Sequence, residues 1–392
     1  MAEELQNQRL GSYAVSTLGG ETVRAYIPAP LPPVPPLRLD TLQVLLEQAN
    51  HAIGRLDGLA SVLPDLPLFI YAYVRKEAVL SSQIEGTQSS LSDLVLFENA
   101  EAPGVPIKDV EEVSNYVAAL FHGMKRIREG FPLSLRLIRE IHEVLLSQGR
   151  GSEKRPGEFR ESQNWIGGTR PGNAMFVPPP PERVMEFMGQ LELFLHEERA
   201  DLPLLIKAGL VHVQFETIHP FLDGNGRLGR LLITFLLCTG GALQEPILYL
   251  SLFFKANRQV YYDLLTQVRT TGNWEAWLEF FLHGVKETSD QAVSAARRII
   301  ALLEDDRRKI ESLGRQAASV LRVHQYAKTH PILSIATAAE QIGITFPTVA
   351  NSIEHMQQLG ILRETTGRQR DRLFTYQNYL NILNEGTEPL SI

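Results

Sequence analysis

One stretch of twelve residues, His219 to Arg230 with the sequence HPFLDGNGRLGR, combines residue types that could act on a bound phosphate compound. Gly224 and Gly226 precede an apolar helical pattern, and a glycine-rich helix N-terminus leaves backbone N–H groups free to bind anions. Arg227 and Arg230 are three residues apart, so both guanidinium groups leave the same side of the first helical turn. Free amides beside two fixed positive charges suit a di- or triphosphate.

Two further residues of this stretch could carry the chemistry itself. Pro220 disfavours the α conformation in the residue before it, so the preceding helix should end at His219. An imidazole has an ordinary pKa of about 6.5, which makes His219 the group here that can accept a proton at neutral pH. Asp223 offers a hard oxygen ligand suited to magnesium already bound to phosphates. We therefore predict a magnesium-nucleotide site with His219 as general base.

Each part of this stretch also has a purely structural interpretation. A histidine before a proline is usually packed or capped, a Gly-x-Gly is usually a turn, and two arginines on a helix usually face solvent. Taken singly, these interpretations are favoured. No packing requirement, however, asks for all of these residues in one loop, so together they favour a nucleotide site.

The stretch is similar, at every fixed position, to the signature of the Fic family, HxFx(D/E)GNGRxxR. The resemblance implies a nucleotidyltransferase that moves AMP from ATP, with magnesium, to a Ser, Thr or Tyr hydroxyl of target proteins and of itself. His219 would deprotonate the hydroxyl and Asp223 would hold magnesium, with Phe221 packed beneath the loop. Asn257 is the candidate contact in the segment that would close the adenine pocket. The residues implied to bind nucleotide in the loop and first helical turn are Gly224, Asn225, Gly226, Arg227, Leu228, Gly229 and Arg230.

A second match, SSQIEG at residues 81–86, resembles the inhibitory motif of this family. Ser81 and Glu85 are four residues apart on one helix face, and Gly86 suits the end of that helix. The resemblance implies that Glu85 pairs with Arg230 and obstructs productive binding of the γ-phosphate.

Two alternative functions stay open. The reverse reaction, removal of AMP, would use the same signature, either alone or in a bifunctional enzyme. A DNA-binding regulator is the alternative of another class, but the helix expected at 346–359 contains neither Lys nor Arg, which leaves nucleic acid as the less favoured partner. The hairpin expected after that helix does carry cationic residues, namely Arg363, Arg368, Arg370 and Arg372. Whether the chain forms a homodimer also stays open.

Helical periodicity dominates the chain and predicts an all-α fold with a C-terminal winged-helix domain. The resemblance implies that the helical core is of the Fic type and carries a small β-hairpin flap. The Gly/Pro-rich segment 157–181 contains the turn formers GGTRPGN between apolar pairs, which predicts the hairpin or an ordered loop. In the family, this flap holds the target protein by strand addition. The expected helices cover residues 40–57, 67–84, 109–129, 134–147, 181–198, 203–218, 226–239, 256–271 and 273–283, followed by a charged connector helix at about 286–313 and a helix at 317–329.

The totals fit this organisation. The 392 residues suffice for two or three domains, expected at 1–105, 106–285 and 286–392. A formal net charge of -7 argues against bulk electrostatic binding to nucleic acid or to anionic membranes. The single cysteine excludes an intrachain disulfide. The N-terminus lacks the pattern of a signal peptide and the longest apolar run is too short to span a bilayer, so a cytoplasmic location and no membrane partner are expected.

Overall fold

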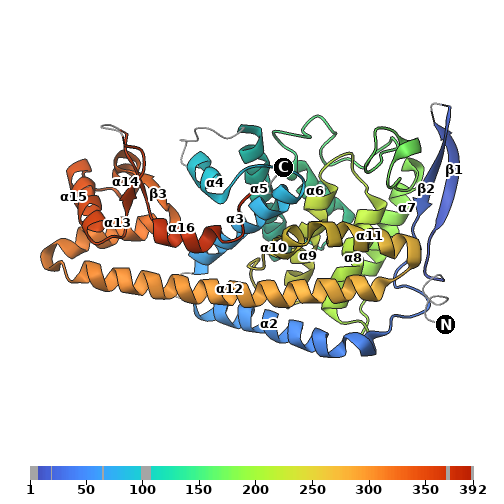
Figure 1. Ribbon diagram of the computed structural model, residues 1–392, viewed down its shortest axis with the longest axis horizontal. Helices are drawn as coiled ribbons and strands as arrows, with labels where there is room; N and C mark the ends of the chain where they lie inside the picture. The colour runs from blue at the N-terminus through green and yellow to red at the C-terminus, as the bar shows by residue number, and fades with distance from the viewer. Residues whose placement is uncertain (1–7, 19, 64–65, 99–106, 368–370, 390–392) are drawn as a thin grey trace.

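The computed structural model describes residues 8–18, 20–63, 66–98, 107–367 and 371–389. The molecule is elongated, with a helical body in the middle and a small C-terminal unit at one end (Figure 1). A hairpin of β1 (Ser12–Leu18) and β2 (Glu21–Ile27) lies at the other end. The predicted all-α class is confirmed for the body. Each helix in the described ranges is too short or too polar to span a bilayer.

The body is built from helices whose apolar faces share one core. Most of them begin and end within a few residues of the periodic segments in the sequence, because each apolar face needs a partner. These helices are α2 (Gln43–Val62), α3 (Leu66–Ile84), α4 (Leu91–Glu98), α5 (Ile107–Arg128), α6 (Leu135–Leu145), α7 (Val184–His196), α8 (Leu204–Ile218), α9 (Asn225–Thr239), α10 (Ser251–Ala256), α11 (Arg258–Thr271) and α12 (Trp274–Glu311), with short 3-10 turns at Leu39–Leu42, Pro171–Asn173, Pro181–Arg183 and Gly314–Gln316.

Three expected helices have different boundaries in the structure. The helix expected at 256–271 begins at Arg258 as α11, and Asn257, whose backbone leaves the helical region, separates it from the short α10, which was not predicted. The helices expected at 273–283 and 286–313 form one helix, α12, of 38 residues, so the boundary expected at 286 lies inside a continuous helix. Gly284 lies inside this helix, at a position where close packing requires a glycine: an added Cβ would lie 2.7 Å from Phe253.

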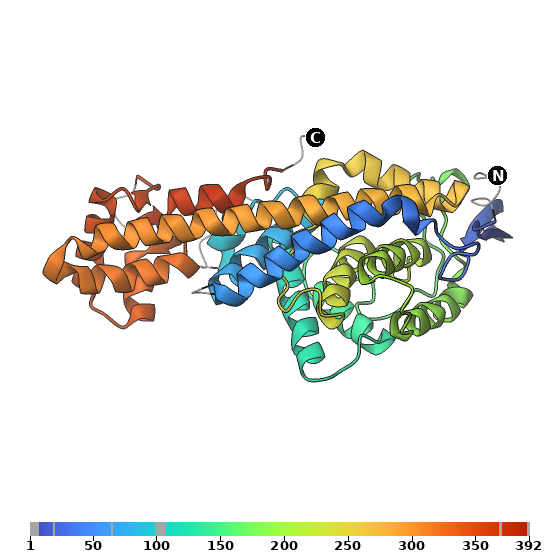
Figure 2. The ribbon, with the colours of Figure 1, turned by 90° about the horizontal axis from the view of Figure 1, so that it is seen from below.

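Helix α12 connects the helical body to the C-terminal unit. It runs along the long axis beside α2 and reaches from the helical body to the C-terminal unit (Figure 2). Small buried residues on both helices, Ala49 and Ala52 on α2 and Ala292 and Ala296 on α12, allow the two to pack closely. Helix α12 therefore packs on α2 in the body and on α13 (Ala317–Thr329) and α16 (Gln377–Asn384) in the C-terminal unit.

The N-terminal hairpin was not predicted, although its sequence carries a signal. Seven-residue strands with alternating side chains flank Gly20, and glycine beside alternating apolar residues is typical of a hairpin turn. Strand β2 packs on the 157–181 segment, where Tyr26 N–H donates to the Val177 carbonyl over 2.9 Å. Within that segment one antiparallel bridge joins Ile166 to Phe176 and the rest is ordered loop, as the turn formers predicted.

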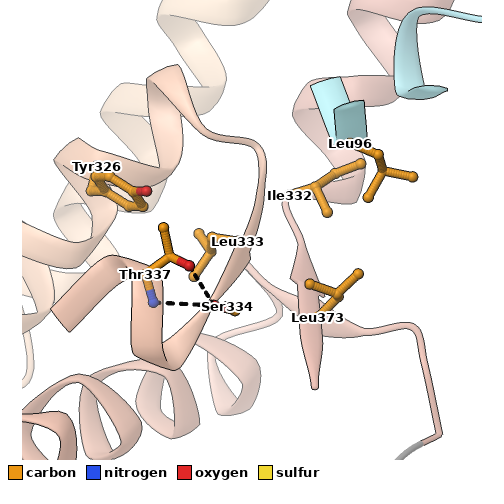
Figure 3. Close-up of a pocket in the computed structure, with 7 residues that line it drawn as sticks. All are labelled: Leu96, Tyr326, Ile332, Leu333, Ser334, Thr337 and Leu373. Atoms are coloured by element: carbon orange, nitrogen blue, oxygen red, sulfur yellow. Dashed lines mark hydrogen bonds between the residues drawn. The ribbon is translucent and has the colours of Figure 1, made fainter. Parts of the chain in front are cut away.

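The C-terminal unit contains the predicted helices and hairpin and additional elements. Its sheet has the order β3-β5-β4 and its strands are antiparallel. Ile332 and Leu373 of this unit face Leu96 of α4 across a small apolar pocket (Figure 3). The predicted wing residues Arg368 and Arg370 lie outside the described residues. The elements are α13 (Ala317–Thr329), β3 (Ile332–Ser334), α14 (Ile335–Ile342), α15 (Phe346–Gln358), β4 (Arg363–Glu364), β5 (Leu373–Thr375) and α16 (Gln377–Asn384).

Candidate active site

The loop between α8 and α9 begins at His219, as Pro220 predicted. Helix α8 ends at Ile218, and His219 adopts the left-handed conformation with φ 50° and ψ 60°. This conformation is unfavourable for a residue with a Cβ atom, so the surrounding structure must hold it. Arg160 supplies that support: its Nε donates to the His219 carbonyl over 2.9 Å, and its backbone N–H donates to the Pro220 carbonyl over 2.9 Å.

The environment of His219 keeps its imidazole neutral. Burial, together with the nearby Arg160 and Arg269 guanidinium groups, lowers the pKa of His219 to about 4. At neutral pH the ring is therefore unprotonated. A half-buried, unprotonated imidazole at the end of a helix can accept a proton from an incoming hydroxyl.

The floor of the loop is a stack of rings. The Phe221 side chain is fully buried and lies on the His142 ring, with the centroids 3.7 Å apart and the planes 12° from parallel. The His142 Nε2–H donates to the Asp223 carbonyl over 3.0 Å, and the Gly157 N–H donates to His142 Nδ1 over 2.9 Å. Burial lowers the pKa of His142 to about 4, so it is neutral in this network. Phe221 therefore occupies the predicted place beneath the loop.

The side chain of Asn225 holds the loop closed. Its Oδ1 accepts from the Phe221 N–H over 2.9 Å and its Nδ2 donates to the Phe221 carbonyl over 2.8 Å. Asn225 was predicted to bind nucleotide. Because its amide is already paired twice with Phe221, the group it can offer a ligand is its backbone N–H.

Helix α9 begins at Asn225, directly after Gly224, whose φ of 75° is the left-handed conformation that glycine adopts without strain. Gly226 lies in the first turn, where backbone N–H groups have no partner in the preceding turn. The Asp223 carboxylate accepts from the Gly224 N–H over 2.6 Å, and 33 % of its side chain is exposed at the lip of this turn. The helix start predicted from the glycines is therefore present, and its binding of an anion stays a prediction.

Arg230 points to α3 and is held there by the SSQIEG segment. Its Nε donates to Ser81 Oγ over 2.8 Å, and its Nη2 donates to the Ser81 carbonyl over 2.9 Å and to Glu85 Oε1 over 2.8 Å. Burial would raise the pKa of Glu85, but the Arg230 guanidinium outweighs it and lowers the pKa, so the pair is ionic. The predicted contact between Glu85 and Arg230 is confirmed.

Arg227 is buried, with 1 % of its side chain exposed, and faces Glu112 of α5 with 3.0 Å between Nη1 and Oε1. Its Nη2 lies 3.7 Å from Asp223 Oδ1. Burial raises the pKa of Glu112, and the positive charges of Arg227 and Arg150 offset part of that rise. The two arginines of the signature therefore meet different carboxylates.

Three other residues that were predicted to bind nucleotide, Leu228, Gly229 and Asn257, make contacts within the protein itself. Leu228 is fully buried in the core, and the Gly229 carbonyl accepts from His212 Nδ1 over 3.1 Å. Gly229 also leaves room for a buried carboxylate, since an added Cβ would lie 2.4 Å from Glu216 Oε1. Asn257 donates to the Phe253 carbonyl of its own helix over 3.0 Å, and its role at the adenine stays a prediction.

Four residues that surround the signature were not predicted from the sequence, namely Glu112, His142, Arg160 and Glu216. Burial raises the pKa of Glu216 to about 7, and its Oε1 has no hydrogen-bond partner among the described residues. Glu112, His142 and Arg160 lie far from the loop in the chain, so no local spacing connects them to it. Glu216, three residues before His219 on a helix, is the one that spacing could have identified.

The residues present fit a magnesium ion that arrives with its nucleotide. Magnesium is commonly held by one or two carboxylates together with substrate phosphates. Asp223 provides one partly exposed carboxylate beside the start of α9. Among the described residues, no group of three or more His, Cys, Asp or Glu side chains converges as a separate metal site.

Curated proteins with related sequences share about half of this chain. A protein adenylyltransferase Fic of Aedes aegypti is 31% identical over 211 residues, which are 53% of this chain and 39% of that protein. A protein adenylyltransferase Fic of Culex quinquefasciatus is 29% identical over 211 residues, with the same coverage of 53% and 39%. The matched segment therefore spans about two-fifths of the length of these relatives.

Solved structures resemble the fold. A Fic family protein from Desulfovibrio desulfuricans is 21% identical, with a TM-score of 0.56 over 87% of this chain and 97% of the other. A Fic domain containing signaling protein from Bacteroides thetaiotaomicron is 23% identical, with a TM-score of 0.53 over 64% of this chain and 97% of the other. At these identities the likeness concerns the fold alone.

Two family models match adjacent parts of the chain. Residues 43–125 match the Fic/DOC family N-terminal region, which includes the SSQIEG segment of α3. Residues 132–237 match the Fic/DOC family, and this range contains His219 and both arginines of the signature. Sequence motif, loop geometry and fold agree with these matches, and the chain therefore contains a domain of the Fic/DOC family together with the family's N-terminal region.

Proposed function

We propose that this protein transfers AMP from MgATP to a Ser, Thr or Tyr hydroxyl of a target protein, and to hydroxyls of its own. The observation that carries the proposal is a neutral imidazole, that of His219, beside a helix start with free amides and two buried arginines. The relatives named above as protein adenylyltransferases support it.

The reaction follows from the roles of these residues. A hydroxyl oxygen attacks the α-phosphorus of ATP while His219 takes its proton, and the bond from that phosphorus to the α–β bridging oxygen breaks, which releases pyrophosphate. The backbone amides of Asn225 and Gly226 and the Arg227 guanidinium would balance the charge on the phosphates. Magnesium, held by Asp223, would neutralise charge on the departing pyrophosphate.

The same geometry supports autoinhibition. Glu85 Oε1 lies over Gly226, because a Cβ added there would be 2.2 Å from it. An internal carboxylate therefore stands above the amides and arginine that a nucleotide phosphate would need. We infer that ATP must displace Glu85, or bind in an unproductive position, until α3 shifts.

The 157–181 segment is the proposed docking site for the target. Its bridged residues Ile166 and Phe176 lie in the segment whose Arg160 holds His219, so a target strand added here would place a hydroxyl near the base. We propose the winged-helix assignment for the C-terminal unit as well. Helix α15 contains neither Lys nor Arg, which favours target recruitment or dimerisation over DNA binding.

Mass spectrometry of the purified protein after incubation with MgATP tests the reaction class. An AMP adduct on a Tyr, Ser or Thr residue is expected, and it should be absent from His219→Ala while that variant still binds ATP. General-base loss typically costs about 10²–10⁴-fold in rate. A His219→Ala protein that forms adducts at the wild-type rate would remove the imidazole from the mechanism. Loss of AMP from a pre-modified protein, without adduct formation, would favour the reverse reaction.

A further inference from the structure

Glu112 on α5 lies outside both the signature at 219–230 and the SSQIEG segment at 81–86. Its side chain nevertheless contacts the buried side chain of Arg227. The Nη1 to Oε1 distance is 3.0 Å, and the two side chains are 1% and 2% exposed. A buried guanidinium without a neighbouring negative charge is costly, so Glu112 determines where the positive charge of Arg227 is stable.

The contact balances charge without using the hydrogen-bond donors of Arg227. Its Nε, Nη1 and Nη2 are buried, and none has a hydrogen-bond partner in the described part of the chain. The N–H bonds of Arg227 therefore do not point at the Glu112 oxygen. Buried donors without partners are unfavourable, and here they remain free for an anion that enters beside α9.

Asp223 is the competing partner. Its Oδ1 lies 3.7 Å from Arg227 Nη2, a long ion pair without a hydrogen bond, and a small rotation of the guanidinium would form a close, hydrogen-bonded pair. Such a pair would use both the cation needed by a phosphate and the carboxylate needed by magnesium. The observed separation therefore needs a group that holds Arg227 back.

Glu112 is itself anchored from two directions. Thr87, which directly follows the SSQIEG segment, donates from Oγ1 to Glu112 Oε1 over 3.2 Å. Arg150 donates from Nη2 to the same oxygen over 3.3 Å, and its Nε lies 3.3 Å from Oε2. With both oxygens of Glu112 contacted, its carboxylate has a defined position against Arg227.

We propose that Glu112 is a positioning residue that keeps Arg227 directed at the nucleotide phosphates and away from Asp223. The inference rests on the nucleotide site proposed above. It states that loss of Glu112 weakens nucleotide binding and also makes magnesium less effective, because Arg227 then pairs with Asp223.

The test uses the whole chain with two substitutions. Glu85→Gly removes the proposed inhibitory carboxylate, and His219→Ala stops turnover. Binding of a fluorescent ATP analogue is measured by anisotropy over a range of MgCl₂ concentrations. Glu112→Ala and Glu112→Gln are compared with this reference. Glu111→Ala is the matched control, since it removes the same residue type from the neighbouring position of α5.

In Glu112→Ala, the analogue should bind about 10- to 100-fold more weakly, the effect of a lost charged contact. The MgCl₂ concentration for half-maximal binding should rise about threefold or more, as expected when a carboxylate gains an exposed ion pair. Glu112→Gln, which keeps the shape and loses the charge, should lie between Glu112→Ala and the reference, and Glu111→Ala should match the reference.

A purely structural role would lower the melting temperature but leave affinity and magnesium midpoint per folded molecule unchanged. If both Glu112 variants bind like the reference, the positioning role is wrong and the proposed function is unaffected. If the reference itself binds no ATP analogue at any MgCl₂ concentration, the proposed nucleotide site is wrong, and the positioning role fails with it. Should Glu112→Ala not fold, Glu112→Gln decides the question.

Discussion

Replacing Glu85 with glycine should convert a restrained enzyme into an active one. In the structure, the Glu85 carboxylate accepts from Arg230 Nη2 over 2.8 Å and lies over Gly226 in the first turn of α9. Arg230 lowers the pKa of this carboxyl against the effect of burial, so a full negative charge occupies the space that a phosphate would need at neutral pH. Glu85→Gly empties that space.

The size of the effect follows from the contact that ATP no longer has to break. Hydrogen bonds to charged groups contribute about 1.5–3 kcal/mol net. With one decade of rate per ~1.36 kcal/mol, self-modification should rise about 10- to 150-fold. The arginine itself should stay in place, because Ser81 accepts from its Nε over 2.8 Å and from its Nη2 over 2.9 Å, independently of Glu85.

The assay is adduct formation over time at fixed MgATP, followed by mass spectrometry. Glu85→Gln, which loses the charge and keeps the shape, should lie between wild type and Glu85→Gly. Arg230→Ala should be inactive. The double variant Glu85→Gly/Arg230→Ala should stay inactive, because the guanidinium expected to bind the γ-phosphate is gone. A Glu85→Gly protein no faster than wild type would refute the inhibitory role and leave Glu85 as a residue that ends a helix.

Three further predictions test the loop. Burial, with Arg160 and Arg269, lowers the pKa of His219 to about 4, so its basic form persists as pH falls. At saturating MgATP, self-modification by Glu85→Gly should therefore stay level from about pH 8 to about pH 5.5 and fall only nearer the lowered pKa; a midpoint near the ordinary value of about 6.5 would contradict this. Asp223→Ala should lose activity that added MgCl₂ partly restores, and an unchanged magnesium dependence would show that Asp223 is no ligand. Phe221→Ala should reduce the free energy of unfolding by about 3–5 kcal/mol in denaturant titrations, because it empties a fully buried site against His142, and a loss below about 1 kcal/mol would argue against that packing.

At the signature and in several helices, features that depend on neighbouring residues in the chain could be predicted from the sequence, whereas the N-terminal hairpin was missed despite its local signal. Pro220 placed the end of α8 at His219, and Gly224 and Gly226 placed the start of α9. The ranges of α3 and α13 followed from apolar periodicity in the same way. The contact between Glu85 and Arg230 spans 145 positions and was expected only through the family resemblance. The structure confirms the contact, and its inhibitory effect stays a prediction.

Tertiary packing alone decided which residues surround the loop. Glu112, His142 and Arg160 come from three separate segments, and each is buried against the signature because its helix or loop folds over it. The amino-acid types of these residues do not by themselves indicate that they are buried. A Glu or Arg is stable in the interior only beside a partner charge or carbonyl, and that partner is known only from the tertiary structure. Helix α12 likewise continues past position 286 because it packs along α2, and no helix-breaking residue ends it there. The sequence by itself thus determined the signature and its local turn, while long-range burial determined the partners that hold His219 and Arg227 in place.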